Sequence, residues 1–191
     1  MNVPHHTPTD PLKGDDEVAA VTRIVEGSPR DYALFVMGTN TAFRASDILS
    51  LNCGDVRHLK VSGLLRIKEK KTSKYRTVTI NEKVVNARQA QLASIEPVTD
   101  DEPLFRGSKC GTRLTVETFG RLVKKWCEAA GLEGQYASHT LRKTFGYTMR
   151  TKHNVSLDKL QQIYGHTSGA VTLKYVAIQA DEIAEVYMLG V

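Results

Sequence analysis

Four polar side chains toward the C-terminal end have the types and spacing needed for chemistry on a phosphate. His139 and Arg142 stand three residues apart, His166 follows Gly165, and Tyr175 comes nine residues after His166. A guanidinium group binds phosphate oxygens through a fork of donors, and a phenol can attack phosphorus as a nucleophile. The pattern therefore predicts a phosphodiester-cleaving site in which Tyr175 is the nucleophile.

Two upstream segments could supply further cations to the same phosphate. Arg44 lies in F-R-A-S-D-I-L-S-L, at the first turn of a short amphipathic helix, where the helix dipole favours anions. A cation gains nothing from its own helix at this end, which favours an external phosphate as the partner of Arg44. The alternative is an Arg44–Asp47 pair on a solvated face. The turn-like K-K-T-S-K-Y-R, which holds Lys70, Lys71 and Lys74, predicts a cationic hairpin tip, and the alternative is a solvated lysine-rich turn.

The composition is typical of a soluble globular protein whose positive charge is concentrated in one stretch. The 191 residues are 41% apolar and 25% charged, which suits one domain with a real core. The net charge is +5, and residues 57–88 hold ten lysines and arginines against two acidic residues, which permits a nucleic-acid partner. No apolar run approaches a membrane span, and the cysteines, Cys53, Cys110 and Cys127, have neither disulfide nor zinc spacing. We therefore expect a cytosolic protein with reduced thiols and no membrane partner.

Apolar periodicity predicts a mainly α fold with one small antiparallel β-hairpin (α+β). Residues 1–14 are expected to be irregular, residues 15–178 to form one domain, and residues 179–191 to form a tail helix that docks on its own domain or on a neighbour. The hairpin is predicted within 61–80, where Leu65 and Ile67 alternate with Arg66 and Lys68. Helices are predicted at about 15–26, 30–38, 45–51, 84–92, 115–131, 138–149, 156–165 and 168–175.

Capping residues and apolar spacing define the helices that carry the polar cluster. Ser138 is expected to cap the helix of His139 and Arg142, which leaves this pair on a face that can point into a cleft. Ser156 is expected to cap the next helix and Gly165 to end it. The side chains predicted to face inward in these two helices are Leu141, Phe145, Met149, Leu157, Leu160 and Ile163.

Taken together, four sequence boxes resemble the catalytic domain of the tyrosine recombinase (phage integrase) family. They are F-R-A-S-D-I-L-S-L, the lysine hairpin K-K-T-S-K-Y-R-T-V-T-I, S-H-T-L-R-K-T-F, and G-H-T-S-G-A-V-T-L-K-Y. Each box alone is weak evidence, but all of them occur in the family's order and spacing. The resemblance covers the chain from about residue 11 to 178.

The resemblance implies a role for each candidate catalytic residue. Tyr175 would form a transient 3′-phosphotyrosyl link, with His139 as general base or orienting group. Arg44 and Arg142 would clamp the non-bridging phosphate oxygens, and His166 would donate a further hydrogen bond. The general acid for the departing 5′ oxygen would be Lys71, with Lys70 and Lys74 as the competing candidates. Such preorganised donors can replace a metal ion, so neither metal nor ATP nor any other cofactor is expected.

Other side chains would support the site or bind DNA. Asp47 occupies the place where the family usually has glutamate, three residues after the arginine, and would buttress Arg44. Tyr164 and Tyr187 are rival tyrosines without the motif's spacing from the histidine. The cations expected to contact DNA are Lys68, Lys70, Lys74, Arg76 and Lys143.

The resemblance also implies partners. They are double-stranded DNA and a homotetramer on two DNA sites, formed from a free monomer in the bacterial cytoplasm and nucleoid, with accessory DNA-bending proteins possible. The tail after Tyr175 would then pack on the next protomer. Typical members carry a separate core-binding domain of about a hundred residues before the catalytic domain. Arg44 comes too early for such a domain, which leaves a minimal recombinase, a fragment or an accessory protein.

Two other functions remain open on sequence grounds. The segments Ser156–Gly165 and Ser168–Val176 resemble two short helices joined by a turn, as in a non-catalytic helix-turn-helix regulator. Retention of every polar candidate weighs against this, because a regulator needs no nucleophile. The same chemistry without partner exchange would give topoisomerase-like nicking and religation.

Overall fold

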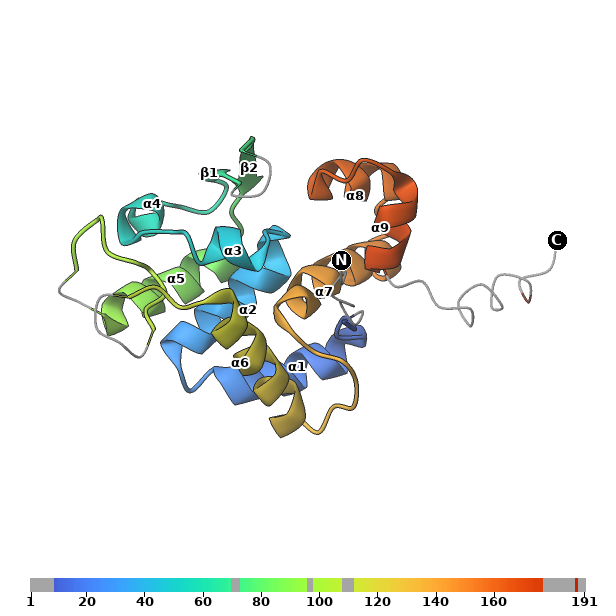
Figure 1. The fold of residues 1–191 in the computed structure, drawn as a ribbon, viewed down its shortest axis with the longest axis horizontal. Helices are drawn as coiled ribbons and strands as arrows, with labels where there is room; N and C mark the ends of the chain where they lie inside the picture. The colour runs from blue at the N-terminus through green and yellow to red at the C-terminus, as the bar shows by residue number, and fades with distance from the viewer. Residues whose placement is uncertain (1–8, 70–72, 96–97, 108–111, 177–187, 189–191) are drawn as a thin grey trace, which may run out of the picture.

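The chain folds into a mainly helical domain with a two-stranded antiparallel sheet (Figure 1), as the sequence predicts. A computed structural model describes residues 9–69, 73–95, 98–107, 112–176 and 188. In chain order the elements are α1 (Gly14–Val25), α2 (Pro29–Thr41), α3 (Ala45–Ile48), α4 (Cys53–Arg57), β1 (Leu64–Lys68), β2 (Tyr75–Thr79), α5 (Glu82–Ser94), α6 (Val116–Ala129), α7 (Ser138–Thr151), α8 (Leu157–Tyr164) and α9 (Gly169–Val176).

Helix α2 packs against both α5 and α7 and lies at the centre of the main core. It starts at Pro29 behind a Ser28 cap and continues to Thr41, three residues beyond its predicted end at Gly38. Gly38 does not stop the helix, because its missing side chain makes room for α7. A Cβ built there would stand 2.6 Å from Leu141 Cδ1. The close crossing outweighs the helix-breaking tendency of one glycine, which costs about 1 kcal/mol.

The hairpin follows the predicted alternation. Leu65 pairs with Val78 and Ile67 with Arg76 in an antiparallel register. Leu65 and Ile67 are buried in the main core, whereas Lys68 is exposed. This one-sided burial fixes the hairpin against the helical layer. The tip at residues 70–72, including Lys70 and Lys71, lies outside the described residues.

The structure differs from the helix predictions at α7, α4 and α3. Ser138 is the first residue of α7 rather than its cap, and Ala137 holds the cap position, where its N–H donates to Thr140 Oγ1 at 3.1 Å. The short helix α4 was not predicted, because a five-residue turn that contains Gly54 has no apolar period to detect. The predicted helix 45–51 ends earlier, at Ile48.

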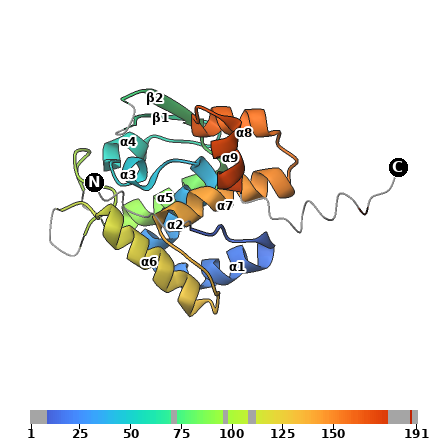
Figure 2. The same ribbon diagram turned by 45° about the vertical axis from the view of Figure 1, so that its right-hand side comes forward.

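Helices α8 and α9 lie together at one end of α7, on the side away from α6 (Figures 1 and 2). Their contact with α7 forms a second apolar cluster that contains Leu160, Tyr164 and Val176. The prediction that Ile163 faces inward is wrong: it is 37% exposed, and its neighbour Tyr164 is fully buried. The tyrosine takes the inward position because Gly146 of α7 leaves space for its hydroxyl group.

The described part of the N-terminal segment is tied to α7 and to the loop before it. The N–H of Asp10 donates to the carbonyl of Gln135 at 2.7 Å, and the N–H of the buried Leu12 donates to Thr144 Oγ1 at 2.8 Å. The predicted tail helix at 179–191 lies outside the described residues, apart from Met188.

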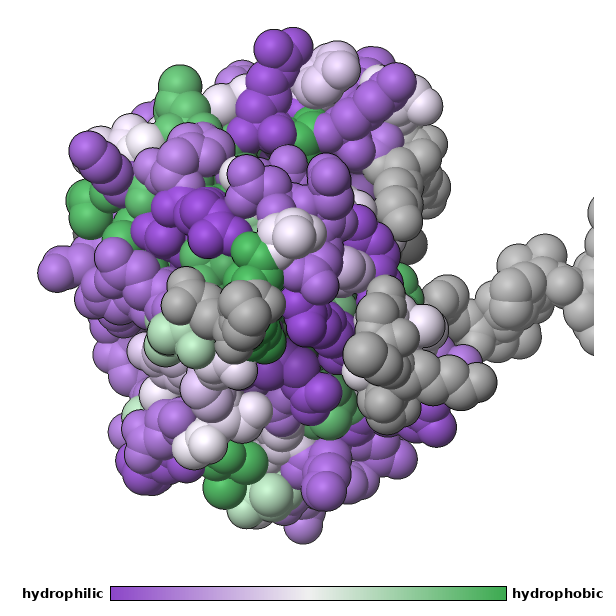
Figure 3. Space-filling view, turned by 90° about the vertical axis from the view of Figure 1, so that its left-hand side faces the viewer, coloured by the Kyte–Doolittle hydropathy of each residue, from purple (hydrophilic) through white to green (hydrophobic). Residues whose placement is uncertain are grey.

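The face of the molecule in Figure 3 is largely hydrophilic, with its apolar residues in small separate groups. Within the described ranges, no helix has the length and apolar character required to cross a bilayer. Cys53 and Cys127 are buried free thiols, and burial raises the pKa of each above its ordinary value, to about 12 for Cys127. Cys110 lies outside the described residues.

Candidate active site

One cavity of about 370 Å³ gathers five of the six residues predicted to be catalytic. It lies between the α2–α3 junction, the first turns of α7 and the α8–α9 pair. The sixth residue, Lys71, lies outside the described residues. The five predicted catalytic residues in its lining are Arg44, His139, Arg142, His166 and Tyr175.

Tyr175 and His139 are in direct contact inside this cavity. The Tyr175 hydroxyl lies 2.8 Å from His139 Nδ1, and both side chains are half-buried. If the neutral imidazole carries its proton on Nε2, Nδ1 is free to accept the phenolic proton. The pair thus has the distance required for general-base activation of a phenol.

Arg142 is a buried cation that lines the cavity. Its guanidinium donates to the carbonyls of Ala42 and Tyr164, the latter at 3.0 Å, and lies over the Tyr164 ring at 4.7 Å. Burial, followed by the charge of Arg76, lowers the pKa of Arg142 to about 10, which still leaves it protonated at pH 7. Among the described residues its Nε has no hydrogen-bond partner. Because Arg142 lines the cavity, its guanidinium places a fixed positive charge beside any anion bound there.

The C-terminal end of α2 anchors two arginines that are far apart in sequence. Arg76 donates to the carbonyl of Thr41 at 3.4 Å, and Arg142 donates to the next carbonyl, that of Ala42. The last carbonyls of a helix lack intrahelical partners and carry the negative end of its dipole. Ala42 adopts a left-handed conformation with φ of 52° and ends the helix there. The end of α2 therefore brings the hairpin and α7 together at the site.

Arg44 precedes α3 and points toward the hairpin. Its Nη1 lies 2.8 Å from Glu69 Oε1 and 3.9 Å from Asp47 Oδ2, so the nearer carboxylate is that of Glu69. Asp47, the expected buttress, is fully buried beside it. Sequence reasoning missed Glu69, although a signal was present. Position 69 continues the buried alternation of Leu65 and Ile67, and a charge at a buried position requires a partner.

His166 follows the left-handed Gly165 that ends α8. Its Nδ1 lies 3.1 Å from Thr172 Oγ1, and its ring stacks on Tyr164 at 4.9 Å with an interplanar angle of 16°. Burial, followed by the nearby charge of Arg142, lowers the pKa of His166 to about 4. The imidazole is therefore neutral at pH 7 and keeps Nε2 for a hydrogen bond in the cavity.

The depressed pKa of His166 predicts a pH-dependent contribution to stability. The unfolded imidazole, with a pKa of 6.5, binds a proton at higher pH than the folded one. The free energy of unfolding should therefore fall as pH decreases from about 6.5 toward 4. We expect His166→Gln to flatten this slope in urea titrations, and the exposed-site variant His153→Gln to retain it. An unchanged slope in His166→Gln would contradict the assignment.

Tyr164 supports the cavity and is not placed as a nucleophile. Its hydroxyl donates to the carbonyl of Arg142 at 2.8 Å, and burial raises its pKa above the ordinary range. Its ring lies under both Arg142 and His166. Tyr187, the other rival, lies outside the described residues.

The close approach of Tyr164 to α7 predicts the effect of filling Gly146. A Cβ at Gly146 would stand 2.1 Å from the Tyr164 hydroxyl oxygen, so Gly146→Ala must displace the ring. We expect a loss of about 1–3 kcal/mol in the free energy of unfolding, measured by urea denaturation. The matched control is Gly120→Ala in α6, where the nearest atom would be 3.5 Å away. The prediction fails if the two variants are equally stable.

The residues expected to bind DNA lie in different environments. Lys68 and Lys74 are exposed on the hairpin, and Arg76 is half-buried and points back to Thr41. Lys143 is half-buried and donates to the Thr9 carbonyl at 2.5 Å, with its Nζ 5.9 Å from the centre of the Tyr175 ring. Burial lowers the pKa of Lys143. Lys70 lies outside the described residues.

Known proteins resemble this chain over most of its length. The sequence pattern of the phage integrase family matches residues 14–182. The probable integrase/recombinase YoeC of Bacillus subtilis (strain 168) is 32% identical over 180 residues, which cover 93% of this chain and 94% of that protein. The tyrosine recombinase XerC of Caldanaerobacter subterraneus subsp. tengcongensis is 32% identical over 159 residues, which cover 82% of this chain and 43% of that protein. The chain thus spans nearly all of one relative but less than half of the other.

Solved structures share the fold. The crystal structure of XerA recombinase has a TM-score of 0.77 at 23% identity, covering 98% of this chain and 65% of that chain. XerH site-specific recombinase bound to palindromic difH substrate, in a post-cleavage complex, has a TM-score of 0.73 at 22% identity, covering 92% and 50%. The fold described above is therefore that of tyrosine recombinase catalytic domains.

Proposed function

This chain belongs to the phage integrase family, and from that membership we propose that it cleaves and rejoins DNA strands through a 3′-phosphotyrosyl intermediate. The observation that carries the proposal is the 2.8 Å contact between the Tyr175 hydroxyl and His139 Nδ1, in a cavity that two arginines line. A site-specific recombinase or integrase uses this chemistry twice, once to cleave one strand and once to join another.

The proposed cleavage step forms one P–O bond and breaks another. The Tyr175 oxygen attacks the scissile phosphorus while its proton passes to His139, and the bond from phosphorus to the 5′ oxygen breaks. The departing 5′ oxygen takes a proton from a general acid, for which Lys71 is our candidate. Rejoining is the reverse reaction with the 5′ hydroxyl of another strand, so the bond energy is conserved.

The proposed roles match the energetic demands of this step. A phenol with a pKa of about 10 is about 4 kcal/mol from its ionised form at pH 7, so a base in contact with it assists the attack. The charge that develops on the non-bridging oxygens needs fixed donors, and Arg44, Arg142 and neutral His166 line the same cavity. Each such donor is commonly worth about 10²–10³ in rate.

We propose double-stranded DNA as the partner, bound by the exposed cations of the hairpin, and a homotetramer on two DNA sites as the active assembly. The free protein would be a monomer, and the tail at 179–191 would pack on the next protomer. Such an enzyme would work in the cytoplasm in association with the bacterial nucleoid, and accessory DNA-bending proteins could assist it. The XerH complex with its difH substrate supports the choice of DNA by analogy.

One observation weighs against a purely DNA-binding regulator. The α8–α9 pair, which resembles a helix-turn-helix, places His166 and Tyr175 in the cavity and packs on α7. A regulator would not need these contacts. Topoisomerase-like action uses the same chemistry, and relaxation of arbitrary supercoiled plasmid by the monomer would identify it.

Trapping the covalent intermediate tests the proposal. We would incubate the purified chain, without metal ions, with a pool of duplexes that carry random sequence and a nick that lets the cleaved fragment escape. Covalent adducts should survive denaturant, and their sequences should converge on a preferred site. Mass spectrometry should place the nucleotide on the peptide that contains Tyr175. Sequence-selective binding without any adduct would instead support the regulator.

A further inference from the structure

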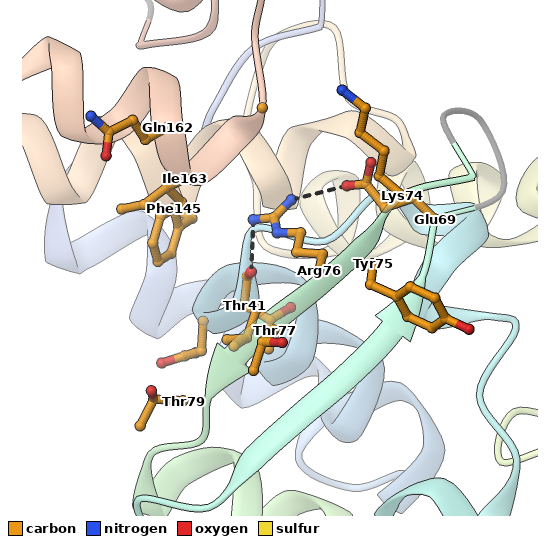
Figure 4. A pocket seen from close by; sticks show the side chains of 13 residues that line it. Thr41, Glu69, Lys74, Tyr75, Arg76, Thr77, Thr79, Phe145, Gln162 and Ile163 are labelled. Atoms are coloured by element: carbon orange, nitrogen blue, oxygen red, sulfur yellow. Dashed lines mark hydrogen bonds and ion pairs between the residues drawn. The ribbon is translucent and has the colours of Figure 1, made fainter.

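A buried carboxylate joins two arginines behind the catalytic cavity. Glu69 Oε1 lies 2.8 Å from Arg44 Nη1 and 3.6 Å from Arg76 Nη1. The Glu69 side chain is only 9% exposed, so these contacts are weakly screened by water. Figure 4 shows Glu69 and Arg76 directed toward each other above β2.

Glu69 is not a wall of the catalytic cavity. It lines a separate cavity of about 550 Å³, together with Arg76, Lys74 and Thr41. Arg44 lines the catalytic cavity and reaches Glu69 with its Nη1. The carboxylate therefore contacts the guanidinium of Arg44 from behind and stays outside the space that a scissile phosphate would occupy.

Glu69 and its partner Arg76 are both held in place by further contacts. The backbone N–H of Glu69 donates to the Lys74 carbonyl and its carbonyl accepts from the Ser73 N–H, each at 2.9 Å, at the base of the hairpin turn. Arg76, on the opposite strand, donates to Thr41 at the end of α2 and lies over the Phe43 ring at 5.3 Å. Glu69 thus joins Arg44 to the hairpin. Through Arg76 it also joins Arg44 to the C-terminal end of α2, whose Ala42 carbonyl accepts a hydrogen bond from Arg142.

The negative charge of Glu69 offsets the repulsion between the positive charges of Arg44 and Arg76. Arg44 and Arg76 both lower the pKa of Arg142 and of His166, so their positive charges act at the catalytic cavity. Burial is the first cause of the lowered pKa of Arg76, and Glu69 opposes it. Without the carboxylate, the guanidiniums of Arg44 and Arg76 would repel each other in a poorly solvated place. Arg44 could then turn away from the cavity.

We propose that Glu69, with Arg76 as its counter-charge, is a positioning residue that holds the Arg44 guanidinium in the orientation needed for strand cleavage. The inference rests on the proposed function, because Arg44 needs an orientation only if it meets a reacting phosphate. It predicts that loss of the Glu69 charge changes the cleavage rate and the DNA affinity differently. Loss of the negative charge misplaces Arg44 and slows cleavage, yet it removes a repulsive charge near DNA and does not weaken binding.

The test compares Glu69→Gln with a charge-matched control. Glu128→Gln removes an exposed carboxylate near the end of α6, where its partner Lys124 is one helical turn away. We expect Glu69→Gln to slow single-turnover adduct formation by about 10- to 100-fold, since small misplacements of a catalytic group have effects of this size. Its Kd for the same DNA should be equal to that of wild type or lower. Glu128→Gln should match wild type in cleavage rate.

A positioning role is distinguished from a purely structural one by two further measurements. Glu69→Asp, which restores the charge on a shorter side chain, should recover part of the lost rate. Arg76→Gln should cost less in the Glu69→Gln background than in wild type, because the pair acts as a unit. Unchanged cleavage in Glu69→Gln, or a parallel loss of rate, affinity and melting temperature, would overturn the inference.

A readout independent of catalysis separates this inference from the proposed function. The Nε–H resonance of Arg44 in a ¹⁵N-arginine NMR spectrum, assigned with Arg44→Lys, should shift and sharpen toward a mobile signal in Glu69→Gln. If wild type forms no adduct but this change occurs, the proposed function fails and the support of Arg44 by Glu69 stands. If wild type forms adducts and the resonance does not change, the positioning role is refuted.

Discussion

Tyr175→Phe is expected to abolish covalent protein–DNA adducts while leaving DNA affinity intact. The substitution removes only the oxygen that lies 2.8 Å from His139 Nδ1. The ring itself can keep its contacts with Tyr164 and His166, whose centroids lie 5.2 Å and 4.9 Å away. Because no other group supplies the bond to phosphorus, the expected loss is on the order of 10⁶-fold, as for other nucleophile deletions. Denaturing gels with nicked duplex would measure it.

The matched control is Tyr164, the fully buried tyrosine that packs against Tyr175. Tyr164→Phe deletes a hydroxyl that donates to the Arg142 carbonyl at 2.8 Å, so it should reduce stability but leave adducts detectable. Filter binding with intact duplex should give one Kd for wild type and Tyr175→Phe. Adducts that persist in Tyr175→Phe, above all on a peptide containing Tyr164, would reject Tyr175 as nucleophile.

Arg142→Lys should produce the second-largest effect, despite the retained charge. The guanidinium serves the carbonyls of Ala42 and Tyr164 and still has Nε without a partner among the described residues. A lysine ammonium is a point charge and cannot make the same planar set of contacts. We expect strand cleavage to fall by about 10²–10³, the usual effect of losing one fixed donor to a developing anion. Single-turnover rates at saturating DNA would measure this directly.

The control for Arg142→Lys is an exposed arginine. Arg121, on α6, has a side chain that is 71% exposed, so Arg121→Lys should leave the cleavage rate unchanged. DNA affinity should change little in Arg142→Lys, because exposed cations dominate binding to the phosphate backbone. A rate close to that of wild type in Arg142→Lys would show that this guanidinium does not contact the reacting phosphate.

Local sequence patterns were sufficient to predict much of the fold and to select the candidate site residues. The helices predicted at 84–92 and 115–131 are confirmed as α5 and α6, and Gly165 ends α8 in a left-handed conformation as expected. The period of two predicted the hairpin and its buried residues Leu65 and Ile67. Such signals are readable because backbone geometry repeats over neighbouring residues. Motif spacing likewise predicts Tyr175 rather than Tyr164 as the nucleophile, and the structure places Tyr175 in the cavity with the other candidates.

Other features depend on contacts between residues that are distant in the chain, and no local period encodes them. Gly38 continues α2 because Leu141, about a hundred residues away, crosses there. Tyr164 is buried in place of Ile163 because Gly146 on another helix admits it. The choice of Glu69 as the nearer partner of Arg44, at 2.8 Å against 3.9 Å for Asp47, is also tertiary. The sequence thus determines which residue types could do the chemistry, whereas long-range packing and charge pairing determine their orientation.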